Sequence, residues 1–518
     1  MFKRITKVAI FLFSCLWVVF LFLDYMDKHP NHLEAFKYFK YFNFLLVLQL
    51  VGLSVFVIVQ FFNVDRIKRK FYTGTTFLVF LAFICLSILF SFDNHVGEET
   101  TFEDCIYFLS RLGSYFLVVI LIFSSAFVLG QEALKRFFNK GNSTSLSLAT
   151  GSMILVLLIM ILASFHQLKQ IPLAILIVLP ILIFYKRSLE IFKSIFFTPF
   201  KDYQKINYWG YLVFFIIIVG LGVNLISILS PYPYGFDARN YYINLTQLIS
   251  QNYGFVEGFQ PYNWQLLMSS GFVLLKSHEI SILLSFSSFI LSLVALNEFA
   301  RKIFKLNINY RLLCMCVLVA TPAIYNQLSM DVKIDFALLF FQIVIVHQFF
   351  KYLNEEKANL SYLVLLGLLS GFALGIKFTH LYLIATLVIT YWTTKSGAIG
   401  LIASSTVSIG IFLLAKIDDV GGLRSAHLGV NFQQWFVLGI GIAVIIYFFI
   451  SKRELLFKQI RFTMLFAIFT SIPILPWAIK NYSETRSLSP KTLLLGQAPG
   501  FKTTFKELDF NLKQKLSN

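Results

Sequence analysis

Residues 208–229 read YWGYLVFFIIIVGLGVNLISIL, and residues 231–242 read PYPYGFDARNYY. The first stretch carries no charged side chain, and about 20 mainly apolar residues are enough to cross the hydrocarbon core of a bilayer. The second stretch puts an acid, Asp237, a base, Arg239, and several tyrosines where that span would meet water. Ionisable groups at the end of an apolar span are taken, as a first hypothesis, to belong to a functional site.

The composition of the whole chain agrees with a membrane protein. Hydrophobic residues make up 58% of the 518 residues, charged residues make up 14%, and the mean hydropathy is +0.75. Soluble domains carry about 25% charged residues. The net charge of +18 comes from clusters of Lys and Arg between the apolar runs, which is the positive-inside pattern, so we exclude a nucleic-acid partner. The cysteines have no metal or redox spacing, and no phosphate-binding loop motif occurs.

The apolar runs predict an all-α polytopic membrane protein with about fifteen transmembrane helices. The predicted spans are 8–23, 42–62, 72–92, 106–130, 147–166, 171–185, 208–230, 279–299, 312–328, 335–352, 360–376, 379–393, 397–415, 434–450 and 462–478. Between two of them lies a long outer loop, 231–278. Its segments 238–253 and 260–276 space apolar residues at helical intervals, so we expect short helices along the outer membrane face.

The charges of the loops orient these spans. Strongly basic loops lie at 65–70, 186–205, 301–305 and 452–461, and the loop 93–104 is acidic. Basic loops in the cytoplasm give an alternating topology with the N-terminus inside. The outward face then holds the Asp237 loop, residues 331–335, residues 377–380 and the C-terminal tail. We therefore expect two parts, residues 1–206 with about six spans and residues 207–518 with the polar clusters.

Five polar clusters on this outward face hold candidate site residues, and each also has a structural interpretation. Asp237 suits a general base for an acceptor group, with Arg239, Tyr241 and Tyr242 beside it, but Asp is also a good helix N-cap. Tyr262, Trp264 and Gln265 suit the apolar faces and hydroxyl edges of a sugar, and Tyr and Trp also mark membrane interfaces.

The other clusters hold both acids and cations. Asp331 and Asp335 could orient an acceptor, hold a divalent metal ion or belong to a solvated hairpin. Lys377, which ends a helix carrying glycines at 367, 371 and 375, could hold a lipid-linked phosphate or snorkel to the interface. His380 follows it. Near the end of the last span, Lys480 and Arg486 are further candidate phosphate-binding cations or interface anchors.

The order of these motifs resembles the C-type glycosyltransferase superfold (GT-C), and more narrowly the bacterial relatives of the protein O-mannosyltransferases and the lipid A aminoarabinose transferase. Three elements carry the resemblance. They are the loop aspartate in GFDARNYY (235–242), the Gly-x-x-x-Gly-x-Lys-Phe-Thr element (371–379) and the Pro-Trp-x-x-Lys-Asn-Tyr element (476–482). The resemblance covers residues 207–518. The chain departs from the protein mannosyltransferases at Ala238, where those enzymes have Glu.

The resemblance implies an inverting glycosyltransferase of the bacterial cytoplasmic membrane, with its site facing outward. The donor would be a polyprenyl-phosphate sugar, and the acceptor a glycan, a lipid or a protein. Asp237 would activate the acceptor, and Lys377, Arg486 and Lys480 would hold the donor phosphate. The resemblance implies no certain cofactor and leaves open whether a divalent metal ion is bound.

Three other classes fit the same features, one of them a structural scaffold built on the first spans, about six in number. A transporter or flippase of lipid-linked saccharides explains the spans and the outward polar groups, but it predicts ionisable residues at mid-membrane and an internal repeat. A polysaccharide polymerase or ligase would act on the same kind of substrate.

Overall fold

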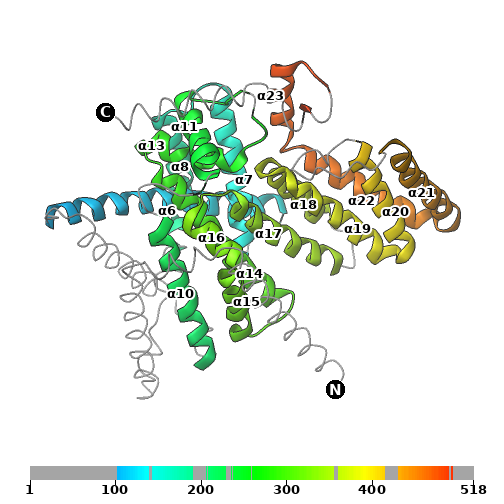
Figure 1. Cartoon of the computed structure of the whole chain (residues 1–518), viewed down its shortest axis with the longest axis horizontal. Helices are drawn as coiled ribbons and strands as arrows, with labels where there is room; N and C mark the ends of the chain where they lie inside the picture. The colour runs from blue at the N-terminus through cyan, green and yellow to red at the C-terminus, as the bar shows by residue number, and fades with distance from the viewer. Residues whose placement is uncertain are drawn as a thin grey trace. The chain divides into compact units, whose positions relative to one another are not determined.

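The structure is a computed structural model that describes residues 102–138, 143–190, 206, 208–228, 235, 237–257, 259–354, 360–414, 430–488 and 492–493. Every regular element in these ranges is a helix (Figure 1), as the sequence predicts. The predicted spans 8–23, 42–62 and 72–92 lie outside the described residues.

The helices follow the apolar runs closely. In chain order they are α6 (Phe102–Phe138), α7 (Thr144–Ser164), α8 (Gln170–Ile183), α10 (Tyr208–Ile228), η2 (Ala238–Tyr242), α11 (Ile243–Gln251), α12 (Asn263–Met268), α13 (Ser270–Leu275), α14 (Glu279–Lys302), α15 (Ile308–Ala320), α16 (Pro322–Met330), α17 (Asp335–Asn354), α18 (Leu360–Ile376), η3 (Phe378–His380), α19 (Leu381–Ser396), α20 (Ala398–Leu414), α21 (Val430–Ser451), α22 (Arg453–Ser471) and α23 (Leu475–Thr485). The short helices expected in the outer loop are η2 with α11, and α12 with α13.

Several of these helices are long and apolar enough to cross a membrane, as expected of an integral membrane protein. Four in the described part meet this test alone, namely α6 from Ser110 onward, α7, α14 and α17. The pair α22 and α23 meets it together, although the two are bent by 62°. Other apolar helices are shorter, for example α18 with 17 residues. The described part thus holds four or five candidate spans.

Two predicted spans are wrong as continuous helices. The run 312–328 is divided between α15 and α16, since Thr321 is extended and Pro322 starts the second helix. The run 462–478 crosses the bend at residues 472–474, between α22 and α23, where Pro473 and Pro476 lie. Proline has no backbone N–H and clashes with the preceding turn, so a helix is bent or stopped there even when the run is uniformly apolar.

The contacts of the chain divide it into two compact units, whose segments alternate along the sequence. The first unit comprises 1–118, 184–239 and 300–332, and the second comprises 119–183, 240–299 and 333–518. In the first unit, α10 packs against both α15 and α16. Its Gly220 lies against Val319 of α15.

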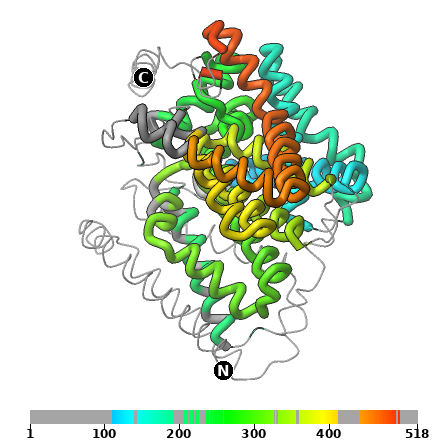
Figure 2. The backbone as a smooth tube through the Cα atoms, turned by 90° about the vertical axis from the view of Figure 1, so that its right-hand side faces the viewer, coloured from blue at the N-terminus to red at the C-terminus, as the bar shows by residue number. Residues whose placement is uncertain are grey.

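In the second unit, α7 contacts α12, α17 and α18, and α18 also packs along α22. Figure 1 and Figure 2 show α18, α19 and α22 as neighbouring rods. The approach of α18 to α22 is close because of the predicted glycines. A Cβ at Gly371 would lie 2.0 Å from the Thr470 carbonyl oxygen, so only glycine fits there.

One end of α7 is fixed by a buried carboxylate. Glu298 of α14 accepts hydrogen bonds from Ser143 Oγ (2.6 Å), from the backbone N–H of Thr144 (3.0 Å) and from Ser145 Oγ (2.6 Å). These donors belong to the N-terminal end of α7, whose first N–H groups have no partner within the helix and whose dipole favours a negative charge. Glu298 therefore holds α14 and α7 in a fixed relation.

Candidate functional site

A single buried side chain, Asn263, connects three of the elements that the sequence analysis singles out. Its Nδ2 donates to the carbonyl of Phe372 on α18 (2.8 Å), and its Oδ1 accepts from the indole Nε1 of Trp477 on α23 (2.7 Å). Gly375 faces the same amide, since a Cβ there would lie 2.3 Å from Asn263 Nδ2. The outer loop, the glycine-rich end of α18 and the Pro-Trp element thus meet at one point.

An aromatic cluster extends from this point into the outer loop. The ring of Trp477 lies 4.5 Å from Tyr262 and 5.2 Å from Phe255, between centroids. Phe259 lies 6.5 Å from Tyr262 and 6.0 Å from Tyr241. Tyr241 in turn stands edge to face against Tyr242, 5.0 Å away.

The phenol of Tyr262 is held by the loop backbone, and it stays protonated. Its hydroxyl accepts a hydrogen bond from the N–H of Val256 (2.7 Å). Burial, followed by the smaller effect of the nearby Glu484 carboxylate, raises the pKa of Tyr262 above the usual range. Burial also raises the pKa of Tyr241, whose hydroxyl accepts a long hydrogen bond from Gln260 Nε2 (3.5 Å). Both phenols can donate hydrogen bonds but are poor bases.

An ion pair lies close to the Asn263 junction. Lys377 follows the last residue of α18, and its Nζ lies 2.7 Å from Oδ1 of Asp335, the first residue of α17. The two side chains keep 34% and 31% of their surface exposed, so water and a ligand can reach them. The pair confirms that the start of α17 and the end of α18 lie at the same end of the second unit, as the predicted topology requires.

Asp237 and Asp331 are described within the first unit. Asp331 Oδ1 accepts a hydrogen bond from the backbone N–H of Ala238 (2.9 Å), and Gly235 packs directly against the Asp331 carboxylate. Asp331 thereby fixes the backbone on both sides of Asp237, which is itself half-buried. The next residues, Ala238–Tyr242, form a π-helix. Such turns are rare and occur frequently at functional sites.

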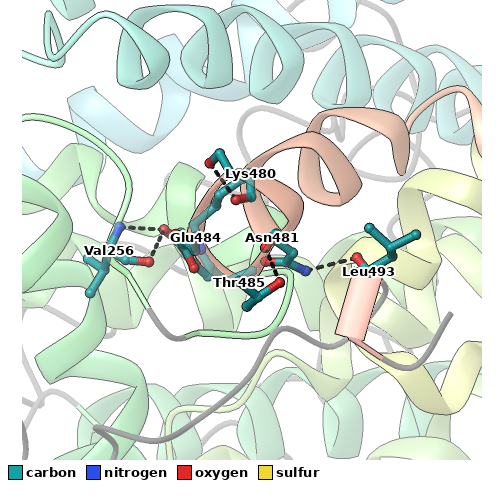
Figure 3. Close-up of polar contacts among 8 residues, drawn as sticks. Val256, Lys480, Asn481, Glu484, Thr485 and Leu493 are labelled. Atoms are coloured by element: carbon teal, nitrogen blue, oxygen red, sulfur yellow. Dashed lines mark hydrogen bonds and ion pairs between the residues drawn. The ribbon is translucent and has the colours of Figure 1, made fainter. Parts of the chain in front are cut away.

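The cations of α23 have different surroundings. Lys480 is buried, and its Nζ lies 2.7 Å from Glu484 one turn later. Figure 3 shows this pair beside Asn481, whose Nδ2 donates to the Leu493 carbonyl (2.9 Å). Arg486 is exposed and ends α23 with a left-handed backbone, φ 54°. The predicted phosphate role of Lys480 would require it to exchange Glu484 for the ligand.

Three other predicted residues are buried inside the second unit. Trp264 packs edge to face against Phe341, with ring centroids 6.4 Å apart, and Gln265 lies beside it on α12. His380 in η3 is fully buried. Among the described residues we find no hydrogen-bond partner for Trp264 Nε1, Gln265 Oε1 or either ring nitrogen of His380. Their sugar-binding role stays a prediction, because in this conformation they belong to the core.

Sequence reasoning missed Asn263, Phe255, Phe259 and Glu484 as parts of this arrangement. Asn263 lies between the predicted residues Tyr262 and Trp264 but carries no chemical signature of its own. Glu484 could have been found, since it stands four residues after Lys480 and such pairs face each other on a helix. Within the described ranges, no group of three or more His, Cys, Asp or Glu side chains could hold a metal ion.

The fold and these features define a polytopic, all-helical membrane protein. We call the Asn263 junction and the Lys377–Asp335 pair, both in the second unit, the polar cluster. A family model described as "Domain of unknown function (DUF8201)" matches residues 114–418, and the chain belongs to this family. The match begins within α6 and ends just after α20, so it includes Asp237 and Lys377. No curated protein and no solved structure matches the chain.

Proposed function

We propose that this protein is a GT-C-like glycosyltransferase that moves a sugar from a polyprenyl-phosphate donor to a glycan, lipid or protein acceptor at the outer face of a bacterial cytoplasmic membrane. One observation carries the proposal. Asn263 joins the outer loop, the glycine-rich end of α18 and Trp477, and the Lys377–Asp335 pair lies at the same end. The glycine-rich end of α18 and the Pro-Trp element are two of the three elements on which the resemblance rests, and a common site requires their proximity. Asp237, in the third element, is assigned to the site from the resemblance.

The assigned roles follow from charge and access. Lys377 offers a cation that is one-third exposed beside a carboxylate, so a donor phosphate can replace Asp335 as its partner. The half-buried ring of Tyr241 supplies an apolar face that suits a sugar ring, and the buried ring of Phe259 packs between it and Tyr262. Arg486, exposed beyond α23, is a second phosphate ligand in this proposal.

Asp237 serves as the general base. An acceptor hydroxyl or amine attacks the anomeric carbon, the bond from that carbon to the phosphate oxygen breaks, and the acceptor proton passes to the Asp237 carboxylate. The polyprenyl phosphate leaves with its negative charge balanced by Lys377. A single displacement inverts the anomeric configuration. Asp331 keeps Asp237 in position through its hydrogen bond to the Ala238 N–H.

The test uses purified protein in liposomes with a polyprenyl-phosphate sugar, and it measures release of polyprenyl phosphate. Lys377→Ala should lower the rate by about 100- to 1,000-fold, as expected when one preorganised donor to a developing negative charge is lost. Lys377→Arg should restore part of it, and Lys452→Ala, an exposed lysine at the start of α22, should not change it. If the protein instead moves an intact lipid-linked saccharide across the bilayer without bond cleavage, this proposal is wrong and the protein is a flippase.

A further inference from the structure

A separate feature of the second unit points to a lipid site away from the polar cluster. A cavity of about 460 Å³ lies between the last turns of α6, the first half of α7 and the first half of α18. This volume is in the usual range of small-molecule pockets, about 300–1,000 Å³. Its walls are almost entirely apolar, including Phe138, Ile154 and Val364. The cavity lies at the start of α18, whereas Lys377 follows the end of the same helix.

One polar group in the cavity wall lacks a partner. Thr150 of α7 is 2% exposed, lines the cavity, and its hydroxyl has no hydrogen-bond partner in the described part of the chain. Three other helical threonines, Thr386, Thr393 and Thr406, each donate their hydroxyl to the carbonyl four residues earlier, which the Thr150 hydroxyl does not do. A buried hydroxyl without a partner costs free energy, so an acceptor brought by a ligand would stabilise this site.

Two basic residues adjoin the cavity lining in the chain. Lys135 and Arg136 lie in the last turn of α6, between the lining residues Ala133 and Phe137. Lys135 and Arg136 are both exposed, and the Arg136 side chain pairs with Glu132 at 3.6 Å. Basic residues there also balance the helix dipole. An apolar cavity with two cations nearby suits a ligand that combines an apolar chain with an anionic head group.

We infer that this cavity binds one anionic phospholipid of the cytoplasmic leaflet. One acyl chain fills the space between α6, α7 and α18, the ester carbonyl accepts a hydrogen bond from Thr150 Oγ1, and the phosphate lies against Lys135 and Arg136. The predicted topology puts the end of α6 on the cytoplasmic side, where anionic lipids gather. The inference does not depend on the proposed transfer reaction, because its residues are not those of the polar cluster.

Native mass spectrometry of the delipidated full-length protein tests the head group. Dioleoyl phosphatidylglycerol should bind more tightly than dioleoyl phosphatidylcholine, and Lys135→Gln with Arg136→Gln should remove that preference, at about fivefold per charge. Lys395→Gln, which removes an exposed basic residue from the last turn of α19, is the matched control and should leave the preference intact. Equal binding of the two lipids by the unchanged protein would overturn the inference.

Two further variants test the cavity and the hydroxyl. Thr150→Val should weaken binding of the ester-linked phosphatidylglycerol about fivefold, the worth of one hydrogen bond, and leave an ether-linked analogue unaffected. Ile154→Trp or, should that variant not fold, Val364→Phe should fill the cavity and lower affinity at least tenfold. Val178→Phe, on an exposed face of α8, controls for added bulk. Unchanged phosphatidylglycerol binding in a folded cavity-filling variant would also overturn the inference.

Discussion

Replacing Asn263 with Leu tests whether the junction of the three elements holds the second unit together. Leu has the same branching of side-chain heavy atoms as Asn, with two larger methyl groups in place of the amide, and it neither accepts nor donates. The change removes two buried hydrogen bonds, of 2.8 Å to Phe372 and 2.7 Å to Trp477, and leaves the Trp477 indole N–H without an acceptor. A net hydrogen bond contributes about 1 kcal/mol and a buried unsatisfied donor costs about 1–3 kcal/mol, so we expect a loss of about 2–4 kcal/mol.

The assay is reversible unfolding of the purified protein in mixed detergent micelles, read by circular dichroism. Trp477→Phe supplies a double-mutant cycle, since phenylalanine has no N–H to be left unpaired. With Trp477→Phe already present, Asn263→Leu should cost at least 1 kcal/mol less than it does alone. A coupling energy near zero, or an Asn263→Leu cost below about 0.5 kcal/mol, would refute the role given to this amide.

Three further predictions address other residues. Asp237→Asn should fold normally, because Asn caps helices as well as Asp, yet lose about 100- to 10,000-fold in transfer rate; an active variant would return Asp237 to a structural role. Glu298→Ala should destabilise the protein by about 3 kcal/mol or more by leaving the Ser143, Thr144 and Ser145 donors unpaired, whereas Glu298→Gln should cost less; equal melting temperatures would contradict this. Because the pKa of Tyr241 is raised from its ordinary value of 10.0, its contribution to the free energy of unfolding is fully present below pH 10.0 and is lost as the pH rises further. Tyr241→Phe should therefore flatten the alkaline part of a plot of stability against pH. An unchanged slope would contradict this prediction.

The helices themselves could be predicted because each is encoded by its own apolar run. The predicted run 360–376 has the same bounds as α18. Of its predicted glycines, Gly367 and Gly371 approach α22, whereas Gly375 approaches Asn263. The end at which Asp335 and Lys377 meet also followed from loop charges alone. These features depend on local composition, which a single sequence displays directly.

The breaks and the polar partners could not be predicted in the same way. The bend between α22 and α23 falls inside a uniformly apolar run, so average hydropathy hides it even though Pro473 and Pro476 are visible. The partnership of Asn263 with Trp477 joins residues far apart in sequence, and nothing in either neighbourhood specifies the other. The burial of Trp264 and His380 likewise depends on tertiary packing, since the same residue types also suit an open binding face.

The close approach at Gly371 links the packing of α18 to the position of α23. A Cβ there would meet not only the Thr470 carbonyl but also Pro473 Cδ, at 2.9 Å, and Pro473 lies in the bend that directs α23. The angle of α23 in turn sets where the Trp477 indole meets Asn263. Gly371 therefore acts as a pivot for α23, and added volume at this position would turn α23 and displace the aromatic cluster around Trp477.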